Sequence, residues 1–130
     1  MWKENLPINC PPATAQELNV EVFRIIKTSI PTEEDFKPYY KLYPDNPRYN
    51  SVCKAFAISF YDTLANAKIA LEEAIGRGNK IGSSIGKYTI TETDGKTVYT
   101  AKSGHYSTWF YQSWDFKDFK HSLIAEIHEN

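Results

Sequence analysis

The chain has 130 residues, 42% of them hydrophobic and 24% charged, and these proportions exclude a disordered or fibrous protein. Fifteen basic and sixteen acidic residues leave a net charge of −1, so nucleic-acid binding through bulk charge is not expected. No apolar run could cross a membrane, and the N-terminus lacks the apolar stretch of a signal peptide. We therefore expect a single globular domain over residues 1–130.

The two cysteines, Cys10 and Cys53, lie far apart in the sequence. A single pair at this spacing is not the cysteine-dense framework of a small secreted domain. Cytoplasmic cysteines are normally reduced. We therefore predict two free thiols and a cytoplasmic location.

Residues 1–19 are predicted to form an extended arm, because their prolines prevent helix formation. Residues 20–26 form the first predicted strand. They are apolar on both faces, which is typical of a central strand covered on both sides. Thr32, followed by acidic residues, fits the N-cap of a short helix that runs to about Tyr40. The Pro, Asp and Asn residues within 41–52 predict a loop.

Residues 55–61 form the second predicted strand, with Phe and Ile side chains on one face and small side chains on the other. Thr63 fits the N-cap of the next helix, which begins at Leu64 and carries an apolar stripe at helical spacing. The glycines at 76 and 78 are both suited to ending this helix.

An Asp94-Gly95 turn lies between two β-branched runs, residues 87–93 and 96–101. This pattern predicts a hairpin, because Asp-Gly suits the two-residue turns that join paired strands. A further strand is predicted for residues 105–112 from its aromatic and hydroxyl side chains.

The C-terminal part begins with a predicted short helix at residues 115–121. Residues 122–128 fit a strand by their alternation and a continuing helix by their 3.6-residue spacing, so both alternatives stay open. The order of elements predicts an α+β fold with a mixed or mostly antiparallel sheet of five to six strands and two to three short helices.

Arg24 is the first candidate site residue, because it lies inside an otherwise apolar strand. A guanidinium group there needs a carboxylate, a phosphate or a row of carbonyl groups. It is therefore either an anion anchor in a cleft or one half of a structural ion pair with Asp35 or Glu92. Exposure at a strand end is the third alternative.

A second group of candidates lies in the predicted strand at residues 105–112. Alternation places four side chains on one face, and together they suit a polar pocket for a planar ligand: His105, Ser107, Trp109 and Tyr111. His105 is suited to act there as acid, base or hydrogen-bond donor. The alternative is that the aromatic residues belong to the core and His105 ends a strand.

Ser59 and Tyr61 lie on the small-residue face of the second predicted strand. Such a face permits close approach of a ligand and equally close packing of a helix. Ser59 has no Gly-x-Ser-x-Gly surroundings, so a hydrolase nucleophile is not expected. The sequence predicts no metal site and no cofactor, since no set of His, Cys or acidic residues has metal-ligand spacing.

Several segments together resemble a group of short bacterial proteins: Val-Phe-Arg at 22–24, Pro-Thr-Glu-Glu-Asp-Phe at 31–36, Cys-Lys-Ala-Phe-Ala-Ile-Ser-Phe at 53–60 and His-x-x-x-Trp at 105–109. This resemblance covers most of the chain and implies a bacterial protein, but it carries no activity with it.

The chain more loosely resembles ADP-ribosyltransferase-like folds, including the RES-type NAD-degrading toxin domains. That resemblance implies a first strand with a ligand-holding arginine, here Arg24, and a later strand with Ser or Tyr, here Ser59 and Tyr61. It also implies a helix behind the second of these strands, here from Leu64. The catalytic glutamate of those folds has no counterpart on a later strand of this sequence, which puts their activity in doubt for this chain.

The sequence favours a non-enzymatic binding or accessory protein that holds a protein segment or a small ligand on the aromatic-rich face around His105 and Trp109. The alternative is an NAD- or nucleotide-using transferase or glycohydrolase. In it Arg24 would hold a phosphate, Ser59 and Tyr61 would frame the pocket, and His105 would assist. These two hypotheses differ in whether Arg24, Ser59 and His105 converge on one cleft.

Overall fold

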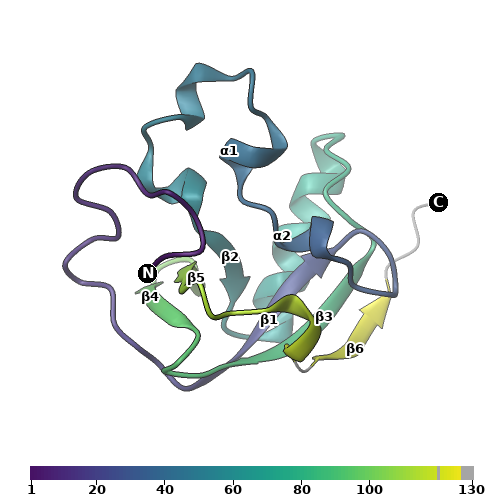
Figure 1. Ribbon diagram of the computed structural model, residues 1–130. Helices are drawn as coiled ribbons and strands as arrows, with labels where there is room; N and C mark the ends of the chain where they lie inside the picture. The colour runs from purple at the N-terminus through teal and green to yellow at the C-terminus, as the bar shows by residue number, and fades with distance from the viewer. Residues whose placement is uncertain (120, 127–130) are drawn as a thin grey trace.

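The computed structural model describes residues 1–119 and the main chain of residues 121–126, which together form an antiparallel sheet with two helices (Figure 1). The strands are β1 (Val20–Ile26), β2 (Ile58–Tyr61), β3 (Ser84–Ile90), β4 (Gly95–Thr100), β5 (His105–Phe110) and β6 (His121–Glu126). Their order across the sheet is β4-β5-β2-β1-β3-β6, with every neighbouring pair antiparallel. The predicted α+β fold is confirmed.

The helices are α1 (Tyr39–Leu42) and α2 (Leu64–Gly76), with short 3-10 segments η1 (Glu33–Phe36), η2 (Pro47–Tyr49), η3 (Cys53–Phe56) and η4 (Phe116–Asp118). Helix α2 begins as predicted: the Thr63 hydroxyl oxygen accepts a 3.0 Å hydrogen bond from the Asn66 main-chain N–H. Among the described residues, no helix has the length and apolar character needed to cross a membrane.

The central strand β1 is covered on both sides, as predicted. On one face Phe23 and Ile25 pack against Ala67 and Leu71 of α2, which lies behind the sheet in Figure 1. The other face belongs to the main core cluster, which surrounds Val22 with aromatic rings. Its buried members are Val22, Phe36, Ile58, Phe60, Tyr88, Ile90, Phe110, Trp114 and Phe119.

The sheet consists of two halves joined by very little pairing. Strand β1 pairs with β3 from Val20 to Ile26, and β2 pairs with β5 along its whole length. Between β1 and β2, however, the register contains only the pair Phe23 and Tyr61. Beyond that pair the two strands separate, and side chains rather than main-chain hydrogen bonds connect the halves.

The predicted hairpin around Asp94-Gly95 is wrong. Strand β3 pairs with β1 and β6, whereas β4 pairs with β5, at the far end of the sheet. The turn itself is present, since the Asp94 carboxylate accepts a 2.8 Å hydrogen bond from the Thr91 N–H. Turn residues determine where the chain reverses locally, but the burial of each strand determines its partner.

Other element predictions also needed new boundaries: the helix expected at 115–121 is only the three-residue η4, and His121 already belongs to β6. The helix expected after Thr32 is divided into η1 and α1 by Pro38, which disfavours a helical conformation in the residue before it. The strand expected at 55–61 begins only at Ile58, because η3 occupies the preceding residues. Residues 121–126 form a strand, which decides between the two alternatives there, and residues 127–128 lie outside the described part.

The prediction of free thiols is also wrong: Cys10 and Cys53 form a disulfide. It joins the N-terminal arm, residues 1–19, to η3. The arm runs over the surface at the β4–β5 end of the sheet, where Gln16 forms an isolated bridge with Thr97 of β4 (Figure 1). Sequence separation could not reveal this pairing, because a folded chain brings distant cysteines together without any local signal.

Candidate functional site

A pocket of about 340 Å³ lies where β1 and β2 separate. Its lining comes from both strands, from η1 and α1 above them, and from the loop after α2: Arg24, Ile25, Lys27, Glu34, Asp35, Tyr39, Leu42, Tyr43, Ser59, Tyr61, Lys80 and Ile81. A volume of this size falls in the range of small-molecule sites. Two larger hollows along the N-terminal arm are shallow and are mainly apolar or lined by the arm itself. A third, of about 430 Å³, lies between the end of β3 and η4.

Arg24 stands at the centre of this pocket and bridges the two halves of the sheet. Its Nε and Nη2 donate to the main-chain carbonyl oxygen of Asp35, at 2.8 Å and 2.5 Å, and its Nη1 donates to that of Ser59 at 2.6 Å. The guanidinium carbon lies 5.4 Å from the ring centre of Phe36 and 5.9 Å from that of Phe60. The prediction that Arg24 needs carbonyl or anionic partners is met by carbonyl groups.

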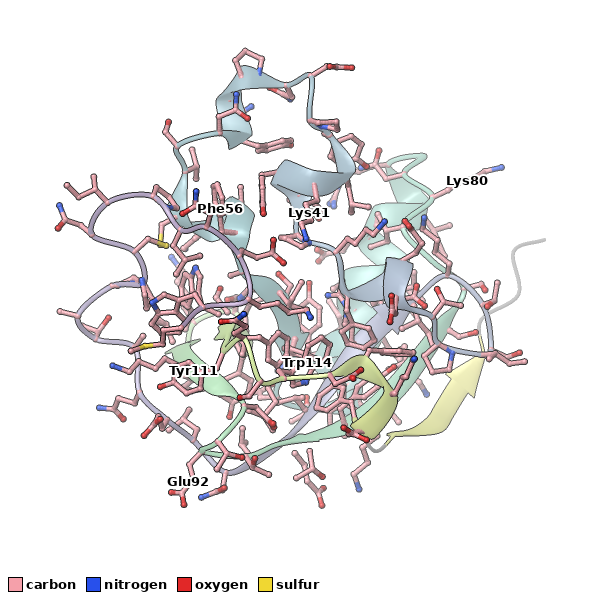
Figure 2. The ribbon with its side chains drawn as sticks, in the orientation of Figure 1. Lys41, Phe56, Lys80, Glu92, Tyr111 and Trp114 are labelled. Carbon is pink, nitrogen blue, oxygen red and sulfur yellow. A yellow bond between two sulfur atoms is a disulfide. The ribbon has the colours of Figure 1, made fainter. Side chains whose placement is uncertain are left out.

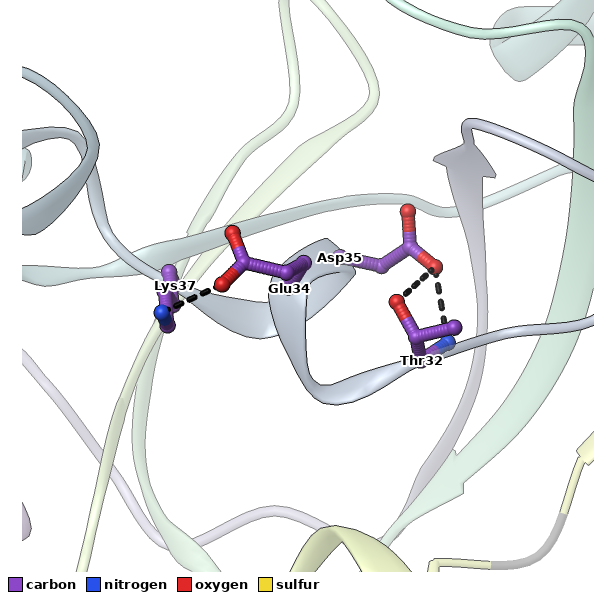
Figure 3. A network of polar contacts seen from close by, with 4 residues as sticks. All are labelled: Thr32, Glu34, Asp35 and Lys37. Atoms are coloured by element: carbon purple, nitrogen blue, oxygen red, sulfur yellow. Dashed lines mark hydrogen bonds and ion pairs between the residues drawn. The ribbon is translucent and has the colours of Figure 1, made fainter.

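The carboxylate of Asp35 does not pair with Arg24. It accepts a hydrogen bond from the main-chain N–H of Lys27 at 3.0 Å. It accepts another from that of Thr32 at 2.9 Å (Figure 3). Among the described residues, the ion pairs do not include Arg24. Burial lowers the pKa of Arg24, and Tyr88 and Asp35 act in the opposite direction. An arginine still remains charged, so the pocket contains a cation that forms no ion pair with another described residue.

The other charges at the pocket add to its positive character. Lys27 and Lys80 are exposed and take part in none of the ion pairs between described residues; Lys80 is labelled in Figure 2. Glu34 is paired with Lys37 (Figure 3), and this hydrogen bond lowers the pKa of the Glu34 carboxyl. The acidic groups therefore have partners, while three cations, Arg24, Lys27 and Lys80, line the pocket.

Tyrosine side chains form the outer wall of the pocket. The ring centres of Tyr39, Tyr43 and Tyr49 lie 5.8–6.0 Å from one another, and Tyr39 and Tyr43 remain about half exposed. Exposed rings in mutual contact present flat apolar faces on which another planar group can stack. Deeper in the pocket, burial raises the pKa of Tyr61, which keeps its phenol protonated.

His105 lies next to the pocket through Ser59. Its Nε2 is 2.8 Å from the Ser59 hydroxyl oxygen, and its ring meets that of Tyr61 edge-on at 5.5 Å. Burial lowers the pKa of His105, and the positive charges of Lys54 and Arg24 lower it further. A neutral imidazole in this position can accept the proton of the serine hydroxyl.

The structure therefore brings together four of the predicted site residues, namely Arg24, Ser59, Tyr61 and His105. The other three predicted candidates do not line the pocket. Ser107 lies directly opposite Ser59 in the β2–β5 register, but it is buried.

Trp109 contacts η3, and Tyr111 contacts the N-terminal arm. Trp109 is 1% exposed and donates from Nε1 to the Cys53 carbonyl oxygen at 3.1 Å. The Tyr111 ring packs on Trp2 at 4.9 Å, and its hydroxyl donates to Glu17 at 2.7 Å. Burial raises the pKa of Tyr111 to about 12, together with its hydrogen bond to Glu17. These contacts leave no room for a ligand at Trp109.

Lys27, Tyr39, Tyr43 and Lys80 line the pocket but were not among the predicted site residues. A signal for the tyrosines existed, because four of them fall within residues 39–49, at the end of the predicted helix and in the predicted loop. The two lysines had no signal, since their approach depends on how the loops fold over the separated strands.

No family model, no curated protein sequence and no solved structure matches this chain. Among the residues that the structure describes, no three His, Cys, Asp or Glu side chains are grouped so as to hold a metal ion. The chemistry of the pocket must therefore be read from its own groups: a held guanidinium, two lysines, tyrosine rings, and a serine next to a histidine.

Proposed function

We propose that this protein is a binding module for a small anionic ligand with a planar ring, of the nucleotide class, in the pocket between β1 and β2. The observation that carries this proposal is the state of Arg24. A guanidinium has five N–H groups. Three donate to carbonyl oxygens, the hydrogen bonds between described residues include none from the remaining two, and Arg24 lines the pocket.

A phosphate or carboxylate in the pocket would satisfy these donors and the exposed lysines together. Arginine is suited to this role because its planar fork matches the two oxygens of such groups. The rings of Tyr39 and Tyr43 would then offer a surface to a base or another aromatic ring. This proposal keeps the binding role expected from the sequence but moves its aromatic surface from Trp109 to α1.

The test is calorimetric titration with ADP, adenosine and inorganic phosphate. We expect ADP to bind more tightly than either fragment, and its affinity to fall as salt is added. Lys27→Gln and Lys80→Gln should each weaken ADP binding by up to about fivefold, because exposed charge pairs contribute about 1 kcal/mol or less. Lys102→Gln, an exposed lysine outside the pocket lining, is the matched control.

Adenosine that binds as tightly as ADP, or lysine variants that equal the control, would contradict an anion site. The lysine variants suit this test because both side chains are exposed and their removal leaves the core intact.

A second candidate function is the transferase or glycohydrolase alternative, which is favoured by the Ser59–His105 hydrogen bond beside the pocket. In this case His105 would accept a proton from Ser59 or from a bound water. Incubation with NAD and measurement of released nicotinamide tests it. Turnover that disappears in His105→Ala supports it, and its absence in the folded wild-type protein contradicts it.

We also propose that the protein resides in an oxidising compartment. A cytoplasmic location would keep most exposed cysteine pairs reduced. The disulfide between Cys10 and Cys53 instead favours an oxidising compartment. Thiol counting on protein extracted under acid quench from its native cell tests this: two free thiols would support the cytoplasm, and none would support an oxidising location.

A further inference from the structure

The N-terminal arm contacts α1, which lines the pocket, and η3, which directly precedes β2. Its Cys10 is bonded to Cys53 at the start of η3. Its Glu4 carboxylate accepts a hydrogen bond from the Tyr40 hydroxyl and lies 2.9 Å from Lys41 Nζ, so the arm also holds α1. Figure 2 labels Lys41 and Phe56 on these two segments.

The same two segments also contact each other. The Tyr40 ring of α1 stacks on the Phe56 ring of η3, with centres 3.9 Å apart and planes 15° apart. Helix α1 supplies Tyr39 and Leu42 to the pocket, and η3 leads directly into β2, which supplies Ser59. The arm, η3 and α1 are therefore in mutual contact beside the pocket, α1 lines it, and the disulfide fixes the arm to η3.

Helix α1 has little support of its own. It has four residues, none of them buried, and Pro38 precedes it. A helix this short does not persist without tertiary contacts. Its described contacts are the stacking on Phe56, the tyrosine group with Tyr49, and the polar links to Glu4.

We propose that the Cys10–Cys53 disulfide is a redox latch for the ligand pocket, an inference that rests on the proposed function. In the oxidised protein the arm holds α1 against η3 and keeps the tyrosine wall in place. A dithiol reductant transfers two electrons and two protons to the cystine, yielding two thiols and its own disulfide. The arm is then released, α1 loosens and the ligand binds more weakly.

The disulfide is placed where a reductant can reach it. Cys10 and Cys53 are both only partly buried, and Cys10 lines a hollow of about 490 Å³ along the arm. Access is the first requirement for exchange with a small dithiol.

The first experiment tests the latch without any ligand. Hydrogen exchange is compared with and without dithiothreitol at the α1 amides of Lys41, Leu42 and Tyr43, which donate to the carbonyl groups of Pro38 and Tyr39. Reduction should accelerate their exchange at least about tenfold more than that of the Ala67 amide of α2, which reports opening of the core. Equal exchange in both states overturns the latch.

The second experiment measures the ADP dissociation constant in the same two states and in the Cys10→Ser, Cys53→Ser double variant. We expect weaker binding, by about tenfold, in the reduced and double-variant proteins. Equal affinity in all three overturns the control of binding. If even the oxidised protein binds no ADP, the proposed function fails, and the exchange comparison still supports or overturns the latch.

Discussion

Arg24 of β1 binds Asp35 of η1 through the main-chain carbonyl of the aspartate and not through its carboxylate. The guanidinium donates twice to the Asp35 main-chain carbonyl, and the Asp35 carboxylate turns away to the N–H groups of Lys27 and Thr32. Asp35 thus orders the loop after β1 with its side chain and holds the arginine with its main chain. These hydrogen bonds fix the position of the Arg24 guanidinium, but no described carboxylate forms an ion pair with it.

Replacing Arg24 by lysine tests this arrangement. Lysine keeps the charge but lacks the fork, so it cannot bond the carbonyl groups of Asp35 and Ser59 together. We expect a loss of about 1–3 kcal/mol in the free energy of unfolding, the usual effect of leaving buried acceptors unsatisfied. Urea unfolding measures it, with Lys102→Gln as the surface control. An Arg24→Lys protein as stable as wild type would show that these hydrogen bonds contribute nothing net.

The histidine beside Ser59 predicts a pH dependence of stability. Burial lowers the pKa of His105, as do the charges of Lys54 and Arg24, whereas an unfolded histidine has a pKa of about 6.5. Below that value the unfolded state binds more protons than the folded state, so stability falls as the pH decreases through about 6.5. Above it the contribution of neutral His105 is fully present.

The variant His105→Gln isolates this effect, because glutamine does not titrate and can still bond the Ser59 hydroxyl. The unfolding free energy of the wild type minus that of the variant should be constant above about pH 7. It should decrease below about pH 6.5, where the wild type loses stability. Parallel curves down to about pH 5 would mean that His105 titrates alike in both states.

Sequence patterning predicted the elements whose local and tertiary signals agree. Residues 20–26 are apolar on both faces and lie at the centre of the sheet, and α2 has both its Thr63 cap and an apolar stripe. Asp94-Gly95 failed as a hairpin signal because it specifies only a turn. The partner of β4 is instead β5, and their pairing includes the buried Thr97 and Thr108, whose hydroxyls bond at 2.9 Å.

The site was predictable in part for the same reason. Arg24 stood out because a charge in an apolar strand must be satisfied, and alternation placed Ser59 with Tyr61. The sequence could not show that β1 and β2 separate after Phe23 and Tyr61, since the residues of a strand do not indicate how many of them pair with a neighbouring strand. The pocket exists because of that separation.

Trp109 should contribute to the stability of the fold rather than to ligand binding. It is the largest fully buried side chain, and Trp109→Ala should lower the free energy of unfolding by about 3–5 kcal/mol. Tyr111→Ala, on the same face but half-buried, should cost only about 1 kcal/mol. Chemical unfolding of both variants decides this. If Trp109→Ala weakens ADP binding tenfold at unchanged stability, the aromatic face of β5 is a ligand site after all.

Reduction of the disulfide should lower global stability as well as loosen α1. Cys10 and Cys53 are 43 residues apart, and closing a loop of this length typically contributes about 2–4 kcal/mol by restricting the unfolded chain. Calorimetry should therefore show a Tm lower by roughly 10 °C in dithiothreitol.

The Cys10→Ser, Cys53→Ser variant is the control for this measurement. It should unfold at the Tm of the reduced wild type and show no response to dithiothreitol, since it has no bond to reduce. If the wild type has the same Tm in both redox states, the bond does not restrain the unfolded chain. The arm would then be held by Glu4, Trp2 and its other non-covalent contacts alone.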